Sequence, residues 1–362
     1  MQIAGAGMAG LCAAARAREL GASPVVLEKG SRAGGSMLLS SGVIWRYRSF
    51  EEFRAQCPEG DERLQRLGFE RLDEGLEWLE SLGAPVVTRE TENPLTTGVR
   101  FDTEGLTDAL LRAAGGVRFG QSGTDAGTGT GDPLVLATGG FQGDDGLVQR
   151  YVRPAGPLRL RANPWSAGDG LRLGLERGAA LSAGLDEFYG RNMADVDFDE
   201  SGFVPLAQVY GRHVRIVNDR GEEFFDHGHV SWSELDLVQA TAHQPGATAW
   251  YLLDEPALDE RVRYGTVRDL VAQAPTRTDP AELPFEPPPG TVAAVRVGAA
   301  ITHTIGGLRV DDRARVLDER DAPIDGLFVA GVDAGGISTG GYASGLATAL
   351  VLGRTAAESV LS

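Results

Sequence analysis

Short apolar runs alternate with helix-type patterns at the start of the chain. An apolar segment at residues 1–4 precedes a glycine-rich turn, an alanine- and leucine-rich segment at 9–20, and a second apolar run at 23–28. This order predicts a strand, a tight turn, a helix and a buried strand. Gly21 ends the predicted helix, and Pro24 stands at a strand start, where it removes no ladder hydrogen bond. The opening is therefore typical of an α/β protein.

The following segments continue this pattern as far as about residue 187. Residues 50–83 carry apolar positions suited to one packed helix face, and residues 103–114 predict another helix. Residues 122–132 are rich in Gly, Thr and Asp and predict a loop or β-turn region. Residues 134–137 predict a strand, and residues 168–170 open a further helix.

The middle of the chain has a different pattern of apolar and polar positions. Short alternating segments such as 214–218 predict strands, and the Pro- and acid-rich stretch 274–290 predicts a connecting loop. Afterwards a buried strand at 326–330, a glycine-rich loop at 331–341 and a helix from 342 to 361 restore the α/β pattern. We expect one α/β domain from residues 1–187 and 296–362, with a second, α+β domain at 188–295 inserted between its two parts.

A dinucleotide fingerprint lies in the first turn. Gly5, Gly7 and Gly10 have the G-x-G-x-x-G spacing, follow a predicted strand, open a helix, and precede a strand that ends at Glu28. Such glycines let the backbone approach a pyrophosphate at a helix N-terminus, and the acidic residue accepts hydrogen bonds from the adenosine ribose. An acidic side chain there disfavours a 2′-phosphate, so NADP is not expected. The alternative is an ordinary glycine-rich turn with a surface glutamate.

Further glycine-rich turns favour FAD over NAD. They stand at the ends of predicted strands or helices, at residues 31–37, 137–140, 168–170 and 331–341. Together they suit an extended dinucleotide with a tricyclic ring system.

Composition and charge exclude several other classes. The chain of 362 residues has 34 basic and 51 acidic side chains, a net charge of −17, which opposes non-specific binding to nucleic acid or an anionic membrane. A hydrophobic content of 42% excludes wholesale disorder. Cys12 and Cys57 have no metal-ligand spacing, so we expect no metal. The absence of a long apolar run or a basic leader leads us to expect a cytoplasmic protein that spans no membrane.

In these motifs the chain resembles the flavoprotein family of fumarate reductase, succinate dehydrogenase and 3-ketosteroid dehydrogenase. The matching segments run in family order: 5–10 with Glu28, 34–36, 40–42, 137–141, 168–170, 217–221, 303–307, and 324–331 through 354. The resemblance implies FAD, a glutathione-reductase-like Rossmann domain built from both chain ends, and a shortened cap over the isoalloxazine.

The fingerprint and the resemblance together give the expected FAD contacts. They are Gly5, Gly7, Met8, Ala9, Gly10, Glu28, Lys29, Gly34, Gly35, Ser36, Ser40, Gly42, Ala137, Thr138, Gly139, Asp169, Gly331, Ser344 and Leu346. No histidine lies at 36–42, where the respiratory enzymes attach FAD covalently, so the resemblance implies non-covalent FAD. Val332 replaces the glutamate that the family has after the last strand, so the chain departs from the family's usual ribityl contact there.

Hydride exchange with a flavin requires a side chain that carries the matching proton. Tyr342 is the first candidate, because its loop resembles the steroid Δ4-dehydrogenase branch and its expected place at a helix N-terminus favours phenolate. The alternative for Tyr342 is an aromatic side chain that packs on the flavin. Tyr210, at the family's proton-donor position, would share a strand face with Arg212, the alternative being a polar cap surface. His303 stands where the family has a substrate-contacting histidine, the alternative being a hydrogen-bonded histidine that does not touch the substrate.

We therefore expect an FAD-dependent oxidoreductase that desaturates a C–C bond next to a carbonyl or carboxylate. The hydride would go to flavin N5 and the proton to a tyrosine, with a small-molecule substrate and an unidentified electron acceptor or donor. The alternatives are a fumarate-reductase-like ene-reductase and a flavin-binding protein without catalysis.

Overall fold

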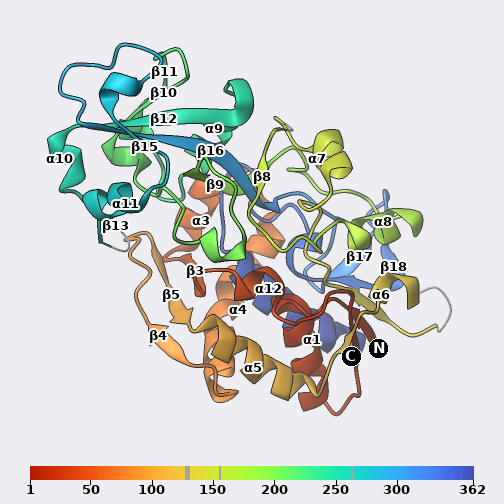
Figure 1. Ribbon diagram of the computed structural model, residues 1–362. Helices are drawn as coiled ribbons and strands as arrows, with labels where there is room; N and C mark the ends of the chain where they lie inside the picture. Colours follow the sequence, from red (N-terminus) through yellow and green to blue (C-terminus); the bar gives the residue numbers. More distant parts are fainter. Residues whose placement is uncertain (127–130, 155, 263–264) are drawn as a thin grey trace. The chain divides into compact units, whose positions relative to one another are not determined.

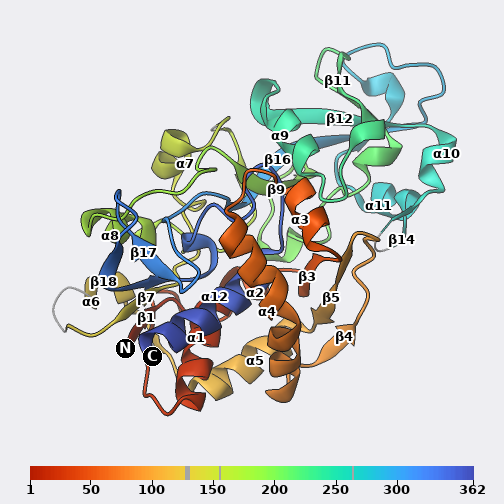
Figure 2. The ribbon, with the colours of Figure 1, turned by 180° about the vertical axis from the view of Figure 1, so that it is seen from behind.

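The computed structural model describes all residues except 127–130, 155 and 263–264 (Figures 1 and 2). The chain divides into two compact units. Unit 1 comprises Met1–Val152, Ala162–Phe188 and His303–Ser362, and unit 2 comprises Arg153–Arg161 and Tyr189–Thr302. The sequence-based boundary at residue 296 falls inside a strand of unit 2, and the domain assignment stays a prediction.

A six-stranded sheet forms the centre of unit 1. Its strands in spatial order are β17 (Arg315–Leu317), β18 (Pro323–Val329), β7 (Leu134–Leu136), β1 (Gln2–Ala4), β2 (Val25–Glu28) and β6 (Arg118–Phe119). All neighbouring strands are parallel except β17, which runs antiparallel to β18. In the register, Ile3 lies opposite both Val26 and Val135, which places the first and last parts of the chain in one sheet.

Helices from distant parts of the chain pack beside one another in unit 1. The helix α1 (Met8–Glu19) packs against α12 (Gly345–Val360) and α5 (Thr103–Ala114), as both views show. A smaller antiparallel sheet of β3 (Val43–Tyr47), β5 (Thr96–Phe101) and β4 (Val86–Thr88) lies beside α3 (Phe50–Gln56) and α4 (Glu62–Ser81). The remaining helices of unit 1 are α2 (Gly35–Leu38), α6 (Gly123–Ala126), α7 (Asp145–Tyr151) and α8 (Asp169–Glu176).

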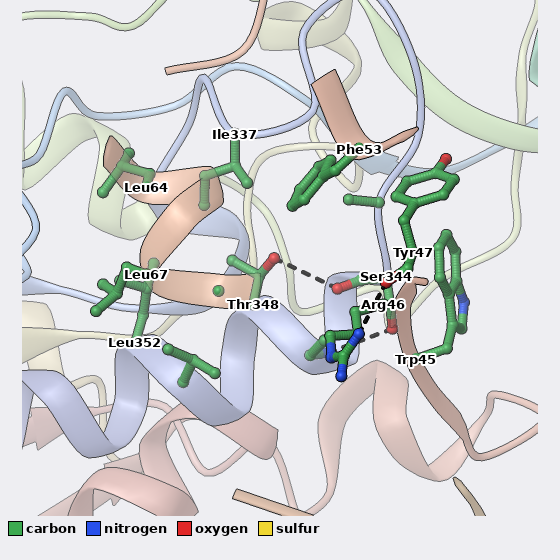
Figure 3. A pocket seen from close by; sticks show the side chains of 14 residues that line it. Trp45, Arg46, Tyr47, Phe53, Leu64, Leu67, Ile337, Ser344, Thr348 and Leu352 are labelled. Carbon is green, nitrogen blue, oxygen red and sulfur yellow. Dashed lines mark hydrogen bonds between the residues drawn. The ribbon is translucent and has the colours of Figure 1, made fainter. Parts of the chain in front are cut away.

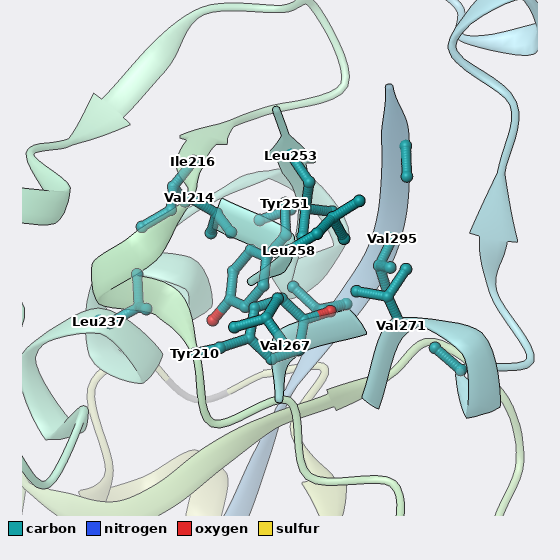
Figure 4. Close-up of a cluster of buried hydrophobic side chains, with 14 of the residues drawn as sticks. Tyr210, Val214, Ile216, Leu237, Tyr251, Leu253, Leu258, Val267, Val271 and Val295 are labelled. Carbon is teal, nitrogen blue, oxygen red and sulfur yellow. The ribbon is translucent and has the colours of Figure 1, made fainter. Parts of the chain in front are cut away.

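Unit 2 is built around the long strand β16 (Ala293–Thr304), whose last two residues belong to unit 1. The sheet order is β11 (Glu223–Phe225), β10 (Arg215–Val217), β12 (Thr248–Leu253), β16 and β15 (Arg277–Thr278), and β8 (Arg159–Leu160) and β9 (Phe188–Ala194) also pair with β16. The other elements are α9 (Leu235–Ala242), α10 (Glu255–Leu258), α11 (Val267–Gln273) and the hairpin of β13 (Arg261–Val262) and β14 (Gly265–Thr266). Tyr210, Tyr251 and aliphatic side chains form its core (Figure 4).

The structure confirms the α/β fold class and corrects four local predictions. The helix α6 lies in the segment predicted as a loop at 122–132, of which residues 127–130 lie outside the described part. Within 274–290 the chain also forms β15 and a 3-10 turn. The last helix begins at Gly345, three residues after the predicted start, and the backbone after Tyr210 forms a 3-10 turn in place of a strand. Among the described residues, no helix is long and apolar enough to cross a membrane.

Candidate cofactor and active site

The turn after β1 requires glycine at two positions for steric reasons. Gly5 has φ = +107°, and a Cβ on it would lie 2.2 Å from the carbonyl oxygen of Ala137. A Cβ on Gly10 would lie 1.9 Å from the carbonyl oxygen of Gly5. Gly7 is different, because the nearest atom to its added Cβ would be the Cα of Gly35 at 4.0 Å. Two glycines thus close the turn, and the third keeps its surface open to a ligand.

The N-terminus of α1 can bind an anion. Gly7 is the N-cap, with no side-chain cap hydrogen bond, and the first turn, which contains Met8 and Ala9, has no acidic residue. The first N–H groups of a helix lack intrahelical partners and carry positive partial charge. A pyrophosphate fits such an end, and the open surface of Gly7 lets it approach.

Glu28, at the end of β2, holds the turn in place. Its carboxylate accepts hydrogen bonds from the backbone N–H of Ala6 at 2.8 Å and of Gly30 at 2.7 Å. The side chain is 8% exposed, so these bonds compensate a buried charge. A carboxylate has about four acceptor sites. Glu28 can therefore hold the turn and still accept hydrogen bonds from a ribose.

Lys29 and Asp169 meet although 140 residues separate them. The ammonium nitrogen of Lys29 lies 2.5 Å from Oδ2 of Asp169, the first residue of α8. The structure thus brings together two residues that were predicted to bind FAD.

A second glycine turn lies directly against the first. Gly34 has φ = +98° and donates its N–H to the carbonyl of Ala6 at 2.8 Å, and a Cβ on Gly35 would lie 3.2 Å from the Cα of Gly7. The hydroxyl of Ser36 accepts a hydrogen bond from the N–H of Asn163 at 3.2 Å. The two turns therefore form one continuous backbone surface.

Ser40 and Gly42 shape the chain that leaves this surface. The Ser40 hydroxyl donates to the Met37 carbonyl at 2.8 Å and accepts from the Gly42 N–H at 3.0 Å. Gly42 has φ = +74°, and a Cβ on it would lie 2.2 Å from the Phe101 carbonyl oxygen. Both residues have clear backbone roles in this position.

Asp333 organises the third turn, and the sequence reasoning missed it. Its buried carboxylate accepts hydrogen bonds from the N–H of Thr138 at 2.5 Å and of Gly140 at 2.9 Å, and from the Thr138 hydroxyl at 2.9 and 3.0 Å. Burial raises the pKa of Asp333, and these hydrogen bonds oppose that shift. The Thr138 hydroxyl in turn accepts from the N–H of Gly170 at 3.0 Å. Asp333 directly follows Val332, the residue that stands in place of the family's glutamate.

The helix α12 begins at Gly345, and Ser344 is its N-cap. The Ser344 hydroxyl accepts from the Ala347 N–H at 3.3 Å, and Leu346 lies in the first turn, which has no acidic residue. Gly331, with φ = +71°, follows the last parallel strand, and a Cβ on it would lie 3.0 Å from the Cβ of Ala9. This helix end offers a second site for an electron-rich group.

Tyr342 stands three residues before the first residue of that helix and lies outside it. Its ring contacts Trp45 edge-on at 5.6 Å between centroids and lies 6.0 Å from the His303 ring, tilted by 37°. Its carbonyl accepts a hydrogen bond from the Tyr47 hydroxyl at 2.7 Å. The expectation that Tyr342 opens the helix is wrong, because Ser344 supplies the cap. Its ring lies beside a histidine from a distant strand.

His303 is held in one tautomer by a backbone carbonyl. Nδ1 lies 3.1 Å from the Thr304 carbonyl oxygen, which can only accept, so Nδ1 carries the hydrogen. Burial lowers the pKa of His303 and favours the neutral ring. Nε2 then bears the lone pair, and it lies 3.3 Å from where a Cβ on Gly345 would be. The His303 ring is thus a base beside the start of α12.

Tyr210 and Arg212 have different surroundings in unit 2. Tyr210 is fully buried in the core, with its ring 5.5 Å from that of Tyr251 (Figure 4). Burial and the nearby Glu234 carboxylate raise the pKa of Tyr210. Arg212 lies 4.0 Å over the Trp232 ring. The predicted shared strand face is wrong, because the segment forms a 3-10 turn.

A pocket in unit 1 lies between α4, β3 and α12. Its walls are mainly apolar, and Ser344 and Thr348 contribute hydroxyl groups (Figure 3). The centres of water-sized molecules can occupy about 30 Å³ of this pocket, so it has room for water. Gly68 on α4 also lines the pocket.

These features define a class of protein. A parallel sheet with glycine turns at its carboxyl edge, a helix N-terminus open to a pyrophosphate and an acidic residue after the second strand form a dinucleotide-binding site. The chain belongs to the family described as FAD binding domain, which matches residues 3–128 and 95–347. The predicted cofactor, FAD, is confirmed by this membership, and the turns described above fit it.

Relatives and solved structures agree with the predicted family. The chain is 24% identical to a probable fumarate reductase of Shewanella frigidimarina (strain NCIMB 400), over 99% of this chain and 74% of the relative. The fold is similar to that of 3-ketosteroid Δ4-(5α)-dehydrogenase from Rhodococcus jostii, with a TM-score of 0.71, 20% identity, and coverage of 100% and 96% of the two chains. A 3-ketosteroid Δ1-dehydrogenase from Sterolibacterium denitrificans gives a TM-score of 0.73 at 17% identity, covering 99% and 98%.

Proposed function

We propose that this FAD-dependent oxidoreductase desaturates a carbon–carbon bond next to a carbonyl group, with Tyr342 as the proton carrier. The observation that carries the proposal is the placement of the Tyr342 ring 6.0 Å from the neutral ring of His303, on the loop that leads into α12. FAD, when bound, supplies the acceptor for the hydride. The chain must then supply the group that takes the proton.

The surroundings of Tyr342 suit proton transfer. Trp45 packs against its ring, and the Tyr47 hydroxyl fixes its backbone. The Nε2 lone pair of His303 provides a base that can accept the proton from the tyrosine. The two rings come from separate segments of unit 1, so the pair depends on the folded unit.

Contacts of three arginines in unit 2 favour a neutral carbonyl substrate over a dicarboxylate. A dicarboxylate needs cationic side chains that are available to it. Arg159 and Arg296 both pair with Asp195, and Arg191 donates to the Ser233 carbonyl. We therefore assign the substrate to the cyclic ketones, including 3-ketosteroids, the class of ligand in the complex of the Rhodococcus dehydrogenase with 4-androstene-3,17-dione.

Several further features of the proposal come from the sequence. FAD binds without a covalent bond, because residues 36–42 contain no histidine. Residues 188–295 act as the cap, the electron acceptor is a separate partner, and the protein works in the cytoplasm. Acid precipitation that releases FAD into the supernatant would support non-covalent binding, and flavin retained in the pellet would contradict it.

Anaerobic mixing of the oxidised protein with candidate substrates tests the reaction. Saturated 3-ketosteroids or cyclic ketones are expected to bleach the flavin absorbance. Bleaching by none of these, together with reoxidation of the reduced protein by fumarate, would favour the fumarate-reductase-like alternative. A flavin that responds to neither class would favour a binding protein without catalysis.

A further inference from the structure

One segment of unit 1, residues 163–169, contacts two of the glycine turns and Lys29. The Asn163 N–H donates to the hydroxyl of Ser36, and the Ser166 hydroxyl oxygen lies 2.7 Å from where a Cβ on Gly139 would be. At its end, Asp169 forms the ion pair with Lys29 described above. The segment thus adjoins the carboxyl ends of β2 and β7, where ligands bind in sheets of this type.

Trp165, at the centre of this segment, lies directly on the backbone of Gly30. A Cβ on Gly30 would lie 2.1 Å and 2.2 Å from two atoms of the six-membered indole ring. Gly30 is also the residue whose N–H binds the Glu28 carboxylate. The indole is therefore fixed two residues from the side chain that holds the adenosine ribose in such sites.

The indole retains an accessible surface. Trp165 is half-buried, and its backbone N–H donates to Asn163 Oδ1 at 3.0 Å. Within the described residues, the indole N–H has no hydrogen-bond partner, and no other aromatic ring stacks on it. A large aromatic surface with one face on a glycine backbone is suited to stack with a base.

We propose that Trp165 forms a wall of the adenosine end of the FAD site and stacks with the adenine. The proposal depends on the FAD cofactor and is independent of the proposed reaction. It makes Trp165 a residue that determines cofactor specificity, favouring the adenine dinucleotide over the mononucleotide FMN. The alternative is an indole that only fills space above Gly30.

The test uses protein from which FAD has been removed, titrated separately with FAD, ADP and FMN. Trp165→Ala removes the aromatic surface and Trp165→Phe keeps one. Trp232→Ala, which removes a ring of unit 2, is the matched control. Loss of one base–aromatic stack corresponds to a dissociation constant raised roughly 5–150-fold.

We expect Trp165→Ala to raise the dissociation constants of FAD and ADP by similar factors and to leave that of FMN unchanged. Trp165→Phe should retain most of the wild-type affinity for FAD and ADP. Trp232→Ala should leave all three constants unchanged. FAD and ADP constants within about twofold of the wild type, or an equal loss for FMN, would overturn the proposal. Should Trp165→Ala not fold, fluorescence decides: ADP should quench an emission component that is missing in Trp165→Phe, and equal quenching in both proteins would overturn it.

Discussion

The Tyr47 hydroxyl donates a hydrogen bond of 2.7 Å to the main-chain carbonyl of Tyr342. Tyr47 is 6% exposed, and burial raises the pKa of its phenol, so the group remains a donor throughout the physiological range. The thiol of Cys57 lies beside the same backbone, and burial raises its pKa to about 12. A neutral donor from β3 thus fixes the loop that carries the proposed proton carrier.

Tyr47→Phe tests this role. The ring and its packing remain, and one hydrogen bond is lost, which costs about 0.5–1.5 kcal/mol of unfolding free energy. We expect flavin reduction to slow by about tenfold at saturating concentrations of a ketone that reduces the wild-type flavin. The KM should change little, because the substitution affects the position of the loop. Tyr151→Phe, which also removes one phenol hydroxyl, serves as the control. A Tyr47→Phe protein that is less stable but reduces its flavin at the normal rate would show that the contact is only structural.

Tyr342→Phe tests the proton carrier itself. The substitution removes only the hydroxyl, so folding and FAD content should be retained. Flavin reduction should slow by about 10²–10⁴-fold if the phenol carries the proton. Stopped-flow absorbance measures this rate, and a near-normal rate would make Tyr342 a packing residue.

Glu28→Gln tests the acidic residue after β2. The amide keeps the shape but loses the charge-assisted bonds to Ala6 and Gly30 and one acceptor for the ribose. Such bonds contribute about 1.5–3 kcal/mol, so we expect FAD to bind roughly 10–150-fold more weakly. Equilibrium dialysis against FAD measures this change. An unchanged dissociation constant would mean that the carboxylate serves only the turn.

His303 predicts a pH dependence of stability. Burial lowers its pKa in the folded protein, so below about pH 6.5 the unfolded chain binds a proton that the folded chain does not. The contribution of the neutral His303 ring to the free energy of unfolding is complete above the pKa of the unfolded chain. It is lost as the pH falls below that pKa, and the free energy of unfolding then decreases by at most about 1.4 kcal/mol per pH unit. Urea unfolding from pH 5 to 8 should show this slope in the wild type and a reduced slope in His303→Gln. Parallel curves for the two proteins would contradict the assignment.

Gly68→Ala tests the pocket wall on α4. A Cβ on Gly68 meets no atom within 4 Å, and alanine is the better helix former, so we expect the protein to gain about 0.5–1 kcal/mol. Gly75→Ala on the same helix is the matched control, because its Cβ would lie 3.0 Å from a methyl carbon of Leu350. That contact should cancel most of the gain. Thermal unfolding of both variants measures the difference, and equal shifts would show that the space around Gly68 has no influence.

Local chemistry made part of the site predictable from sequence. Glycine spacing identifies the turn after β1, because the positive φ of Gly5 is a local property of that turn. The N-cap preference of serine could also have placed the start of α12 after Ser344 and kept Tyr342 outside the helix.

Long-range partners could not be predicted in this way. Asp333 binds Thr138, 195 residues away, and nothing near either residue in the sequence indicates the other. Alternation failed at Tyr210 because it assumed a strand. A Cβ on Gly211 would lie 2.2 Å from Leu237, a tertiary contact that the sequence does not reveal.

The carboxylates of Glu28 and Asp333 have a consequence for how the holoprotein assembles. Each is already bonded to the backbone of a turn that the cofactor needs, so the polypeptide itself supplies the order of the binding surface. Ordering of loops is a major cost of association, and a preorganised surface avoids much of it. FAD binding would therefore spend little of its free energy on ordering these two turns.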